Sequence, residues 1–285
     1  MTANAQARTA SGTFLHGGHV HANGIRQHYL RYGAQKQAAP VILIPGITSP
    51  AITWGFVAEQ LGRHLDVYVL DVRGRGLSQA GDTLDYSLDA QAADVVAFAQ
   101  ALGLAGASLI GHSMGGRIAV RALRLAPDLF SRAVLVDPPV SGPQRRPYPA
   151  NLPWYIDSMA LARQGTDAQG MLAFCPTWTE AQRQLRAEWL HTCDERAIRT
   201  SFEGFHTDDM HADLPHVSVP LHLVTAERGD VVRDEDVAEL QSLAPGMTHY
   251  RVPDAGHMIP WDNEAGFYAA FGTFLGPDLT DLQLT

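Results

Sequence analysis

Short runs of apolar residues without polar alternation recur along the chain and are separated by stretches with helical periodicity. The first four runs lie at residues 41–44, 67–70, 107–110 and 133–136, and further strands follow at 221–225 and 249–252. Helical patterns occupy residues 87–102, 114–125, 234–243 and 264–275. Strands that are apolar throughout are buried on both faces, so their alternation with helices predicts an α/β fold with a mostly parallel sheet flanked by helices.

The amino-terminal part of the chain has a different pattern. Residues 13–33 contain strand-like pieces, and Asn23-Gly24 is a hairpin turn signal before a predicted strand at residues 25–32. The first 12 residues are small and polar, which predicts a disordered leader at residues 1–12. At the start of the helix over 87–102, Ser87 is a plausible N-cap.

Between residues 140 and 215 the strand–helix rhythm stops. Prolines at positions 143, 147, 149 and 153 come first, and helical stretches rich in Trp, Arg and Glu follow, for example at residues 180–191. This pattern predicts a helical lid over residues 140–215, inserted after the strand that ends at Asp137. The α/β core then comprises residues 13–139 and 216–285.

Composition limits the partners and the location of the protein. The chain has 285 residues, 46% of them hydrophobic, and a formal net charge of −9 without a block of Lys and Arg, which argues against nucleic acid as a partner. It carries neither a signal-peptide pattern nor an apolar run of about 20 residues, so no membrane association is expected and the cytoplasm is the predicted location. Cys175 and Cys193 have no metal-ligand or CxxC spacing, which predicts free thiols and no metal site.

The sequence Gly111-His112-Ser113-Met114-Gly115 follows a predicted strand and opens a predicted helix. This context is typical of a nucleophile elbow, in which a strained turn raises the serine hydroxyl above the sheet and small neighbours let strand and helix approach. Ser113 is therefore the predicted nucleophile. The Met114 N–H, at the helix N-terminus, is a predicted oxyanion donor. The alternative is a tight glycine-rich turn with an ordinary serine.

His257 lies in the loop after the last predicted strand, from which an imidazole can reach the serine hydroxyl. The fold orders its residues serine, acid, histidine along the chain, and this order distinguishes His257 among 13 histidines. Two aspartates at the carboxyl ends of strands, Asp137 and Asp230, are candidates for the acid that orients the imidazole. In this fold the acid more commonly follows the later strand, which favours Asp230. Whichever of the two aspartates is not the acid would be a loop-capping carboxylate.

Two glycine-containing loops follow the first two apolar strands. Residues 45–49 (PGITS) occupy the place where this fold supplies a second oxyanion donor, and the Ile47 N–H is the candidate; a plain strand-to-helix loop is the alternative. Residues 71–76 (DVRGRG) match neither a P-loop nor a dinucleotide fingerprint. They predict a structural turn in which Arg73 forms a salt bridge.

Several longer stretches give the chain a resemblance to the N-formylmaleamate deformylases of aerobic nicotinic acid degradation, within the α/β-hydrolase superfamily. Three stretches are similar to the superfamily in general: GHSMGGR, LDVRGRGLS and AGHMIPW. Five others are similar to the deformylases: NGIRQHYLRYG, PGITSPAITWGFVAEQLG, LVDPPVSGP, LPWYIDS and RAEWLHTC. The resemblance covers residues 17–275, lid included. It implies hydrolysis of N-formylmaleamate to maleamate and formate without a cofactor, by a triad of Ser113, Asp137 and His257. The deformylases have no acid that matches Asp230, so the resemblance favours Asp137.

The resemblance also implies a small anionic substrate, whose carboxylate requires a cationic partner. The candidates at the lid are Arg145, Arg146, Arg186 and His191, and the aromatic candidates for the pocket wall are Trp154, Tyr155, Trp178 and Trp189. A solvated surface position, or packing of the lid on the core, is the simpler role for any one of them. Two other functions stay open: an esterase or enol-lactonase on a related small carboxylate, and a non-catalytic ligand receptor on a hydrolase scaffold.

Overall fold

A computed structural model of the chain describes residues 12–33, 39–280 and 282. Residues 1–11 of the predicted leader lie outside the described residues. No helix within the described ranges is both long and apolar enough to cross a membrane.

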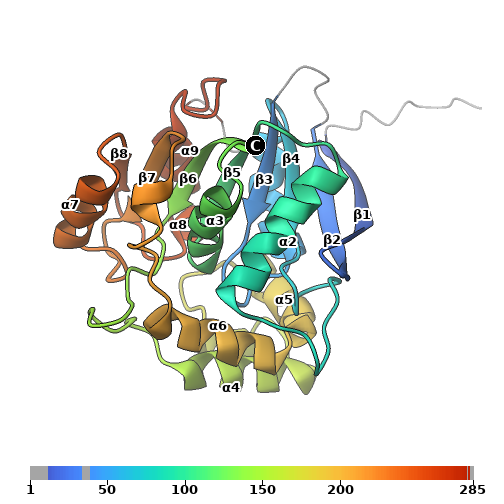
Figure 1. Ribbon diagram of the computed structural model, residues 1–285. Coiled ribbons are helices and arrows are strands. Elements are labelled where there is room, and N and C mark those ends of the chain that lie inside the picture. Colours follow the sequence, from blue (N-terminus) through green and yellow to red (C-terminus); the bar gives the residue numbers. More distant parts are fainter. Residues whose placement is uncertain (1–11, 34–38, 281, 283–285) are drawn as a thin grey trace, which may run out of the picture.

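The centre of the molecule is an eight-stranded sheet with the strand order β1-β2-β4-β3-β5-β6-β7-β8 (Figure 1). Its strands are β1 (Phe14–Ala22), β2 (Ile25–Tyr32), β3 (Pro40–Ile44), β4 (Asp66–Leu70), β5 (Ala107–His112), β6 (Phe130–Val136), β7 (Leu221–Ala226) and β8 (Thr248–Val252). β2 pairs antiparallel with β1 and with β4, and all other neighbours are parallel. The mostly parallel sheet predicted from the apolar runs is therefore confirmed.

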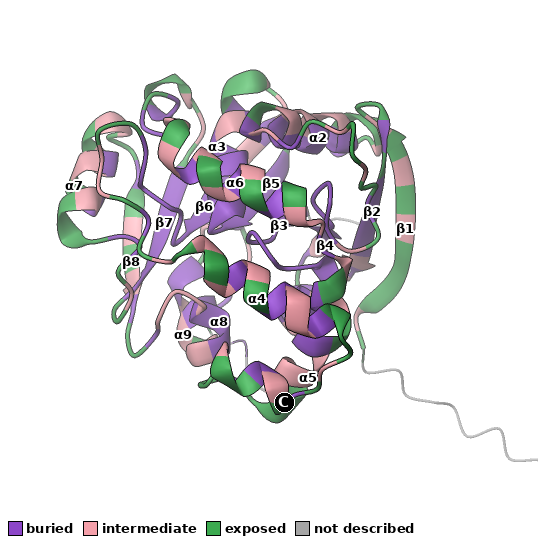
Figure 2. Cartoon of the chain, turned by 90° about the horizontal axis from the view of Figure 1, so that it is seen from below, coloured by how far each residue is buried: buried purple, intermediate pink, exposed green. Residues whose placement is uncertain are grey.

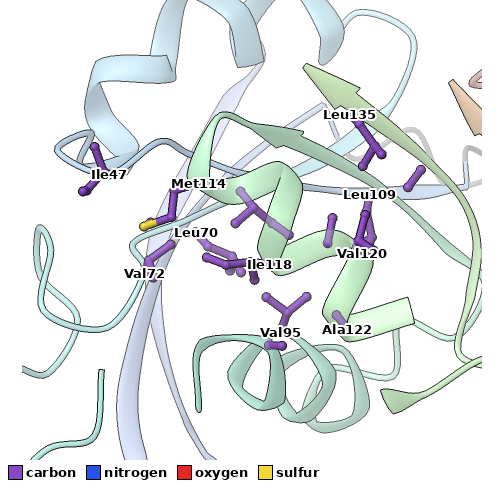
Figure 3. Packing of buried hydrophobic residues seen from close by; sticks show 14 of the residues in the cluster. Ile47, Leu70, Val72, Val95, Leu109, Met114, Ile118, Val120, Ala122 and Leu135 are labelled. Atoms are coloured by element: carbon purple, nitrogen blue, oxygen red, sulfur yellow. The ribbon is translucent and has the colours of Figure 1, made fainter. Parts of the chain in front are cut away.

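Alternate side chains of each central strand enter two apolar layers, one on either face of the sheet. The helices of the core are α1 (Gly55–Leu61), α2 (Leu88–Ala101), α3 (Met114–Leu125), α7 (Asp234–Leu243), α8 (Ile259–Asp262) and α9 (Glu264–Phe271), with the 3-10 helix η1 (Ala51–Trp54) before α1. α2, α3 and α7 pack on one face, where Ile118, Val95 and Leu109 meet in one cluster (Figure 3). α1 and α9 cover the other face.

Local signals explain where several helices begin and end. The Ser87 side chain accepts a hydrogen bond from the Ala90 N–H and caps α2, as predicted. The helix predicted over residues 264–275 ends earlier, at Phe271, because Gly272 adopts a positive φ of 49° that a helix cannot continue.

The chain between β6 and β7 forms a helical insertion, defined here as residues 137–220. It contains α4 (Leu152–Arg163), η2 (Gly170–Ala173), α5 (Glu180–Trp189), η3 (Leu190–Thr192), α6 (Glu195–Thr207) and η4 (Leu214–His216) and no strand. The insertion lies across the end of the sheet at which the parallel strands finish (Figures 1 and 2). Its helices bury one side and expose the other, whereas the central strands β3, β5 and β7 are buried almost throughout (Figure 2).

Candidate active site

Ser113 lies at the sharp turn between β5 and α3. Its backbone has φ 53° and ψ −119°, a region that residues other than glycine rarely adopt. The turn is possible because its neighbours lack side chains: a Cβ on Gly115 would lie 2.0 Å from the Ile44 carbonyl oxygen, and one on Gly111 would lie 2.3 Å from the Gly115 carbonyl oxygen. This tight turn places Ser113 in the wall of a cavity.

His257 lies in the loop between β8 and α8 and reaches Ser113. Its Nε2 is 3.0 Å from Ser113 Oγ, so a neutral imidazole can accept the hydroxyl proton. The loop is held by His112, whose Nε2–H donates to the His257 carbonyl oxygen over 3.1 Å. Burial, and secondly the neighbouring His257, lowers the pKa of His112 to about 3. His112 therefore stays neutral and adds no charge beside the imidazole.

The structure places the carboxylate of Asp137 next to His257. Asp137 Oδ2 accepts a hydrogen bond from His257 Nδ1–H at 2.7 Å, and Asp137 is fully buried at the end of β6. Asp230 is 58% exposed at its side chain and accepts a hydrogen bond from Arg233 Nε at 2.6 Å. That hydrogen bond lowers the pKa of Asp230 below its ordinary value. Of the two candidate acids, only Asp137 therefore meets the imidazole.

The two predicted oxyanion donors lie beside this elbow. Within the described ranges, the backbone N–H groups of Ile47 and Met114 have no acceptor. The buried Arg75 contacts both residues: its Nε donates to the Ile47 carbonyl oxygen over 3.0 Å, and its Nη2 lies 3.4 Å from Met114 Sδ. Figure 3 shows Met114 at the start of α3 and Ile47 on the separate loop that follows β3. Both N–H groups are therefore free to bind a developing negative charge at fixed positions.

Ser113 and His257 open into a cavity of about 500 Å³. Its walls come from the loop after β3, the elbow, the loop after β7 and the helical insertion. The aromatic residues that line it are Tyr148, Trp154, Tyr155, Phe174 and Trp178. A cavity of this size, with aromatic walls and few convergent polar groups, suits a small organic molecule.

Of the four cationic candidates from the sequence, Arg186 of α5 is the one that the structure places in the cavity wall. It is buried, and among the described residues its Nη atoms reach only the backbone oxygen and the hydroxyl of Thr48, at 3.5 and 3.4 Å. The guanidinium lies 5.5 Å from the Trp154 ring centroid and 5.8 Å from that of Trp178. Its Nε has no hydrogen-bond partner, and no carboxylate in the described ranges pairs with it. Burial of a cation without an ion-pair partner lowers the stability of the folded protein, and a bound anionic ligand would offset that loss.

The other three cationic candidates do not line this cavity, which corrects the prediction from sequence. Arg145 pairs with Glu239 at 2.7 Å and Arg146 with Asp236 at 2.5 Å, because both face the acidic helix α7. His191 lies on η3 at a separate surface groove. Of the aromatic candidates, Trp154, Tyr155 and Trp178 line the cavity, and Trp189 is absent from the described lining.

The sequence analysis did not single out Tyr148, which lies beside His257. Its hydroxyl oxygen is 3.5 Å from His257 Nε2 and 3.3 Å from the Tyr155 hydroxyl. The flanking prolines, Pro147 and Pro149, indicate a rigid extended segment but not its direction. The position of Tyr148 depends on how the insertion packs on the core.

Cys175 lines the cavity, and Cys193 lies at the separate groove beside η3. Cys175 and Cys193 are free, as predicted, and both are buried. Burial raises the pKa of both thiols, to about 12 for Cys193, so neither forms a ready thiolate. In the described residues no three His, Cys, Asp or Glu side chains are grouped to hold a metal ion.

A strained serine after the central strand, a histidine after the last strand and helices on both faces of a parallel sheet define a hydrolase scaffold. The chain belongs to the α/β hydrolase fold family, whose model matches residues 39–264. It is 58% identical to N-formylmaleamate deformylase of Pseudomonas putida over 263 residues, 92% of this chain and 97% of the relative.

Solved structures agree with this placement. A serine-to-alanine variant of the N-formylmaleamic acid deformylase from Pseudomonas putida S16 superposes with a TM-score of 0.86 at 56% identity, over 90% of this chain and 99% of that one. E-2-(acetamidomethylene)succinate hydrolase has a TM-score of 0.76 at 21% identity, over 93% and 100% of the two chains. The second similarity is one of fold alone.

Proposed function

We propose that this protein is a serine hydrolase that cleaves the formyl C–N bond of N-formylmaleamate to give maleamate and formate. The observation that carries the proposal is the hydrogen-bonded series from Ser113 through His257 to Asp137, at a cavity that contains the unpaired Arg186. The 58% identity with a deformylase over almost its whole length supports the choice of substrate.

In the first half of the reaction the enzyme is formylated. His257 Nε2 takes the proton of Ser113 as Oγ attacks the formyl carbon, and the Ile47 and Met114 N–H groups bind the oxyanion. Buried Asp137 holds the Nδ1–H tautomer and stabilises the imidazolium. When the C–N bond breaks, its electron pair goes to the nitrogen, which takes the proton from His257 Nε2, and maleamate leaves.

In the second half water releases the formyl group. His257 removes a proton from water as the water oxygen attacks the formyl-enzyme, and the same two N–H groups bind the second oxyanion. Formate leaves and Ser113 Oγ regains its proton. Every proton moves through one imidazole, so no cofactor is needed.

The helical insertion acts as the lid of this site and selects a small anionic substrate. Arg186 binds the substrate carboxylate, and Trp154 and Trp178 shield that ion pair from water, which strengthens it. We place the reaction in the cytoplasm, as the sequence predicts; the free thiols are compatible with a reducing compartment.

Replacing Arg186 with methionine should raise the KM for N-formylmaleamate about 10- to 100-fold, because a charge-assisted hydrogen bond to the carboxylate is lost. The turnover of an uncharged ester such as 4-nitrophenyl formate should change little. Steady-state kinetics on both substrates measure the difference.

Arg145→Met is the matched control, since Arg145 pairs with Glu239 outside the cavity. It should leave both substrates unaffected. Equal losses on the charged and the uncharged substrate in Arg186→Met would mean that Arg186 supports the wall and binds no carboxylate.

A formate-release assay on N-formylmaleamate, run beside small aryl esters and enol-lactones, tests the proposed function directly. A preference for the esters or lactones by several orders of magnitude would replace the deformylase with an esterase or lactonase. No turnover of any substrate, with no labelling of Ser113 by a fluorophosphonate, would favour a ligand receptor.

A further inference from the structure

Tyr148 reaches the reacting groups from the helical insertion. Only 6% of the residue is exposed, and its hydroxyl lies 3.5 Å from the same His257 nitrogen that faces Ser113. The ring is fixed by an aromatic contact with Phe205, at 4.9 Å between centroids. The phenol is therefore a preorganised group beside the nitrogen that delivers the proton to the leaving group.

The surroundings of Tyr148 allow its hydroxyl to donate a hydrogen bond toward the cavity. Its hydroxyl is 3.3 Å from that of Tyr155, and a hydrogen bond donated by Tyr155 leaves the Tyr148 proton free to point elsewhere. Burial raises the pKa of Tyr148 well above its ordinary value, so the phenol stays protonated at working pH. On the cavity side its polar neighbours are the His257 imidazole and the Ser113 hydroxyl.

We infer that the Tyr148 hydroxyl is a catalytic group that binds the carbonyl oxygen of the departing amide, the one retained in maleamate. The inference rests on the proposed function. The leaving nitrogen must lie next to His257 Nε2 to be protonated, and its attached carbonyl oxygen is two bonds away. A donor 3.5 Å from Nε2 is within reach of that oxygen, whereas the formyl oxygen is bound by Ile47 and Met114.

The chemistry of the C–N cleavage explains why a donor is useful there. As the bond breaks, its electron pair goes to nitrogen and is shared with the neighbouring carbonyl oxygen, which becomes negative. A hydrogen bond from Tyr148 strengthens as that charge grows and so acts in the transition state. The proton that nitrogen receives comes from His257, and Tyr148 keeps its own. The site thus favours N-acyl amide leaving groups over plain amines, which have no such oxygen.

Tyr148→Phe, assayed on N-formylmaleamate and on 4-nitrophenyl formate, tests this inference. Both substrates pass through the same formyl-enzyme, but nitrophenolate is a good leaving group that needs no donor. We expect kcat/KM to fall about 10- to 100-fold for the amide and by no more than about twofold for the ester. Tyr155→Phe, which removes only the group that orients Tyr148, should show the same selectivity with a smaller loss.

The other outcomes separate the possible failures. Equal losses on amide and ester would assign Tyr148 a structural role in holding Ser113 or His257, and unchanged kinetics on both would remove it from the mechanism; either result overturns the inference. Failure of the unaltered enzyme to release formate from N-formylmaleamate, with the ester still cleaved, would overturn the proposed function and the inference with it. Fluorophosphonate labelling of Tyr148→Phe verifies that Ser113 remains active in the folded variant.

Discussion

Replacing Ser113 with alanine should lower formate release from N-formylmaleamate by about 10⁵- to 10⁶-fold and leave the fold intact. The loss is large because the nucleophile and the covalent formyl-enzyme both disappear, and only oxyanion binding remains. The fold should persist because the hydroxyl bonds only to side chains of the site, His257 and Tyr148 among the described residues, and alanine differs from serine only by the missing hydroxyl. Formate quantification and thermal unfolding of both proteins measure the two effects.

Ser141→Ala is a matched control for this experiment. Ser141 is also buried, and its hydroxyl has no hydrogen-bond partner in the part of the chain that the structure describes, so its removal should change neither activity nor stability appreciably. Substantial turnover in Ser113→Ala would refute the nucleophile assignment, whatever the control shows.

The sheet and its helices could be predicted because their signals are local. Four-residue apolar runs identified β3 and β4, and the elbow glycines identified the turn before α3, whose predicted bounds of 114–125 agree with the structure. Such signals depend on burial of both strand faces and on close approach of backbone atoms. Both requirements select recognisable residue types, apolar side chains in the strands and glycines in the turn.

The polar partners in the site were harder to predict, because they depend on long-range packing. Arg145, Arg146 and Arg186 are similar in the sequence, but α7 supplies carboxylates to the first two, about 90 residues further along the chain. Arg186 differs only because α5 turns it between Trp154 and Trp178. Nothing local distinguishes a paired surface arginine from a buried unpaired one.

The two candidate acids illustrate the same limit. Asp137 and Asp230 both follow parallel strands, β6 and β7, that are neighbours in the sheet. Strand ends alone cannot separate them. The structure separates them by burial, since one is fully enclosed beside His257 and the other is exposed and paired with Arg233.

Substitution of each aspartate by asparagine should therefore give opposite results. Asp137→Asn should lower kcat by about 10⁴-fold, the loss seen when a triad acid can no longer hold the correct histidine tautomer. Asn tolerates the positive φ of 46° at this position, and its oxygen can still face the Ala226 N–H, 3.5 Å from Asp137 Oδ1. Its NH₂ group would then face His257 Nδ1 and force the imidazole to carry its proton on Nε2.

With the proton on Nε2, His257 cannot accept the proton of Ser113, so attack on the formyl carbon fails although every atom remains in place. Asp230→Asn removes an exposed ion pair with Arg233 and should change kcat by no more than about twofold. Steady-state formate release by the two variants, each verified as folded by thermal unfolding, compares them directly. A greater loss in Asp230→Asn than in Asp137→Asn would transfer the acid from the end of β6 to the loop after β7, and would require that loop to close on His257 during turnover.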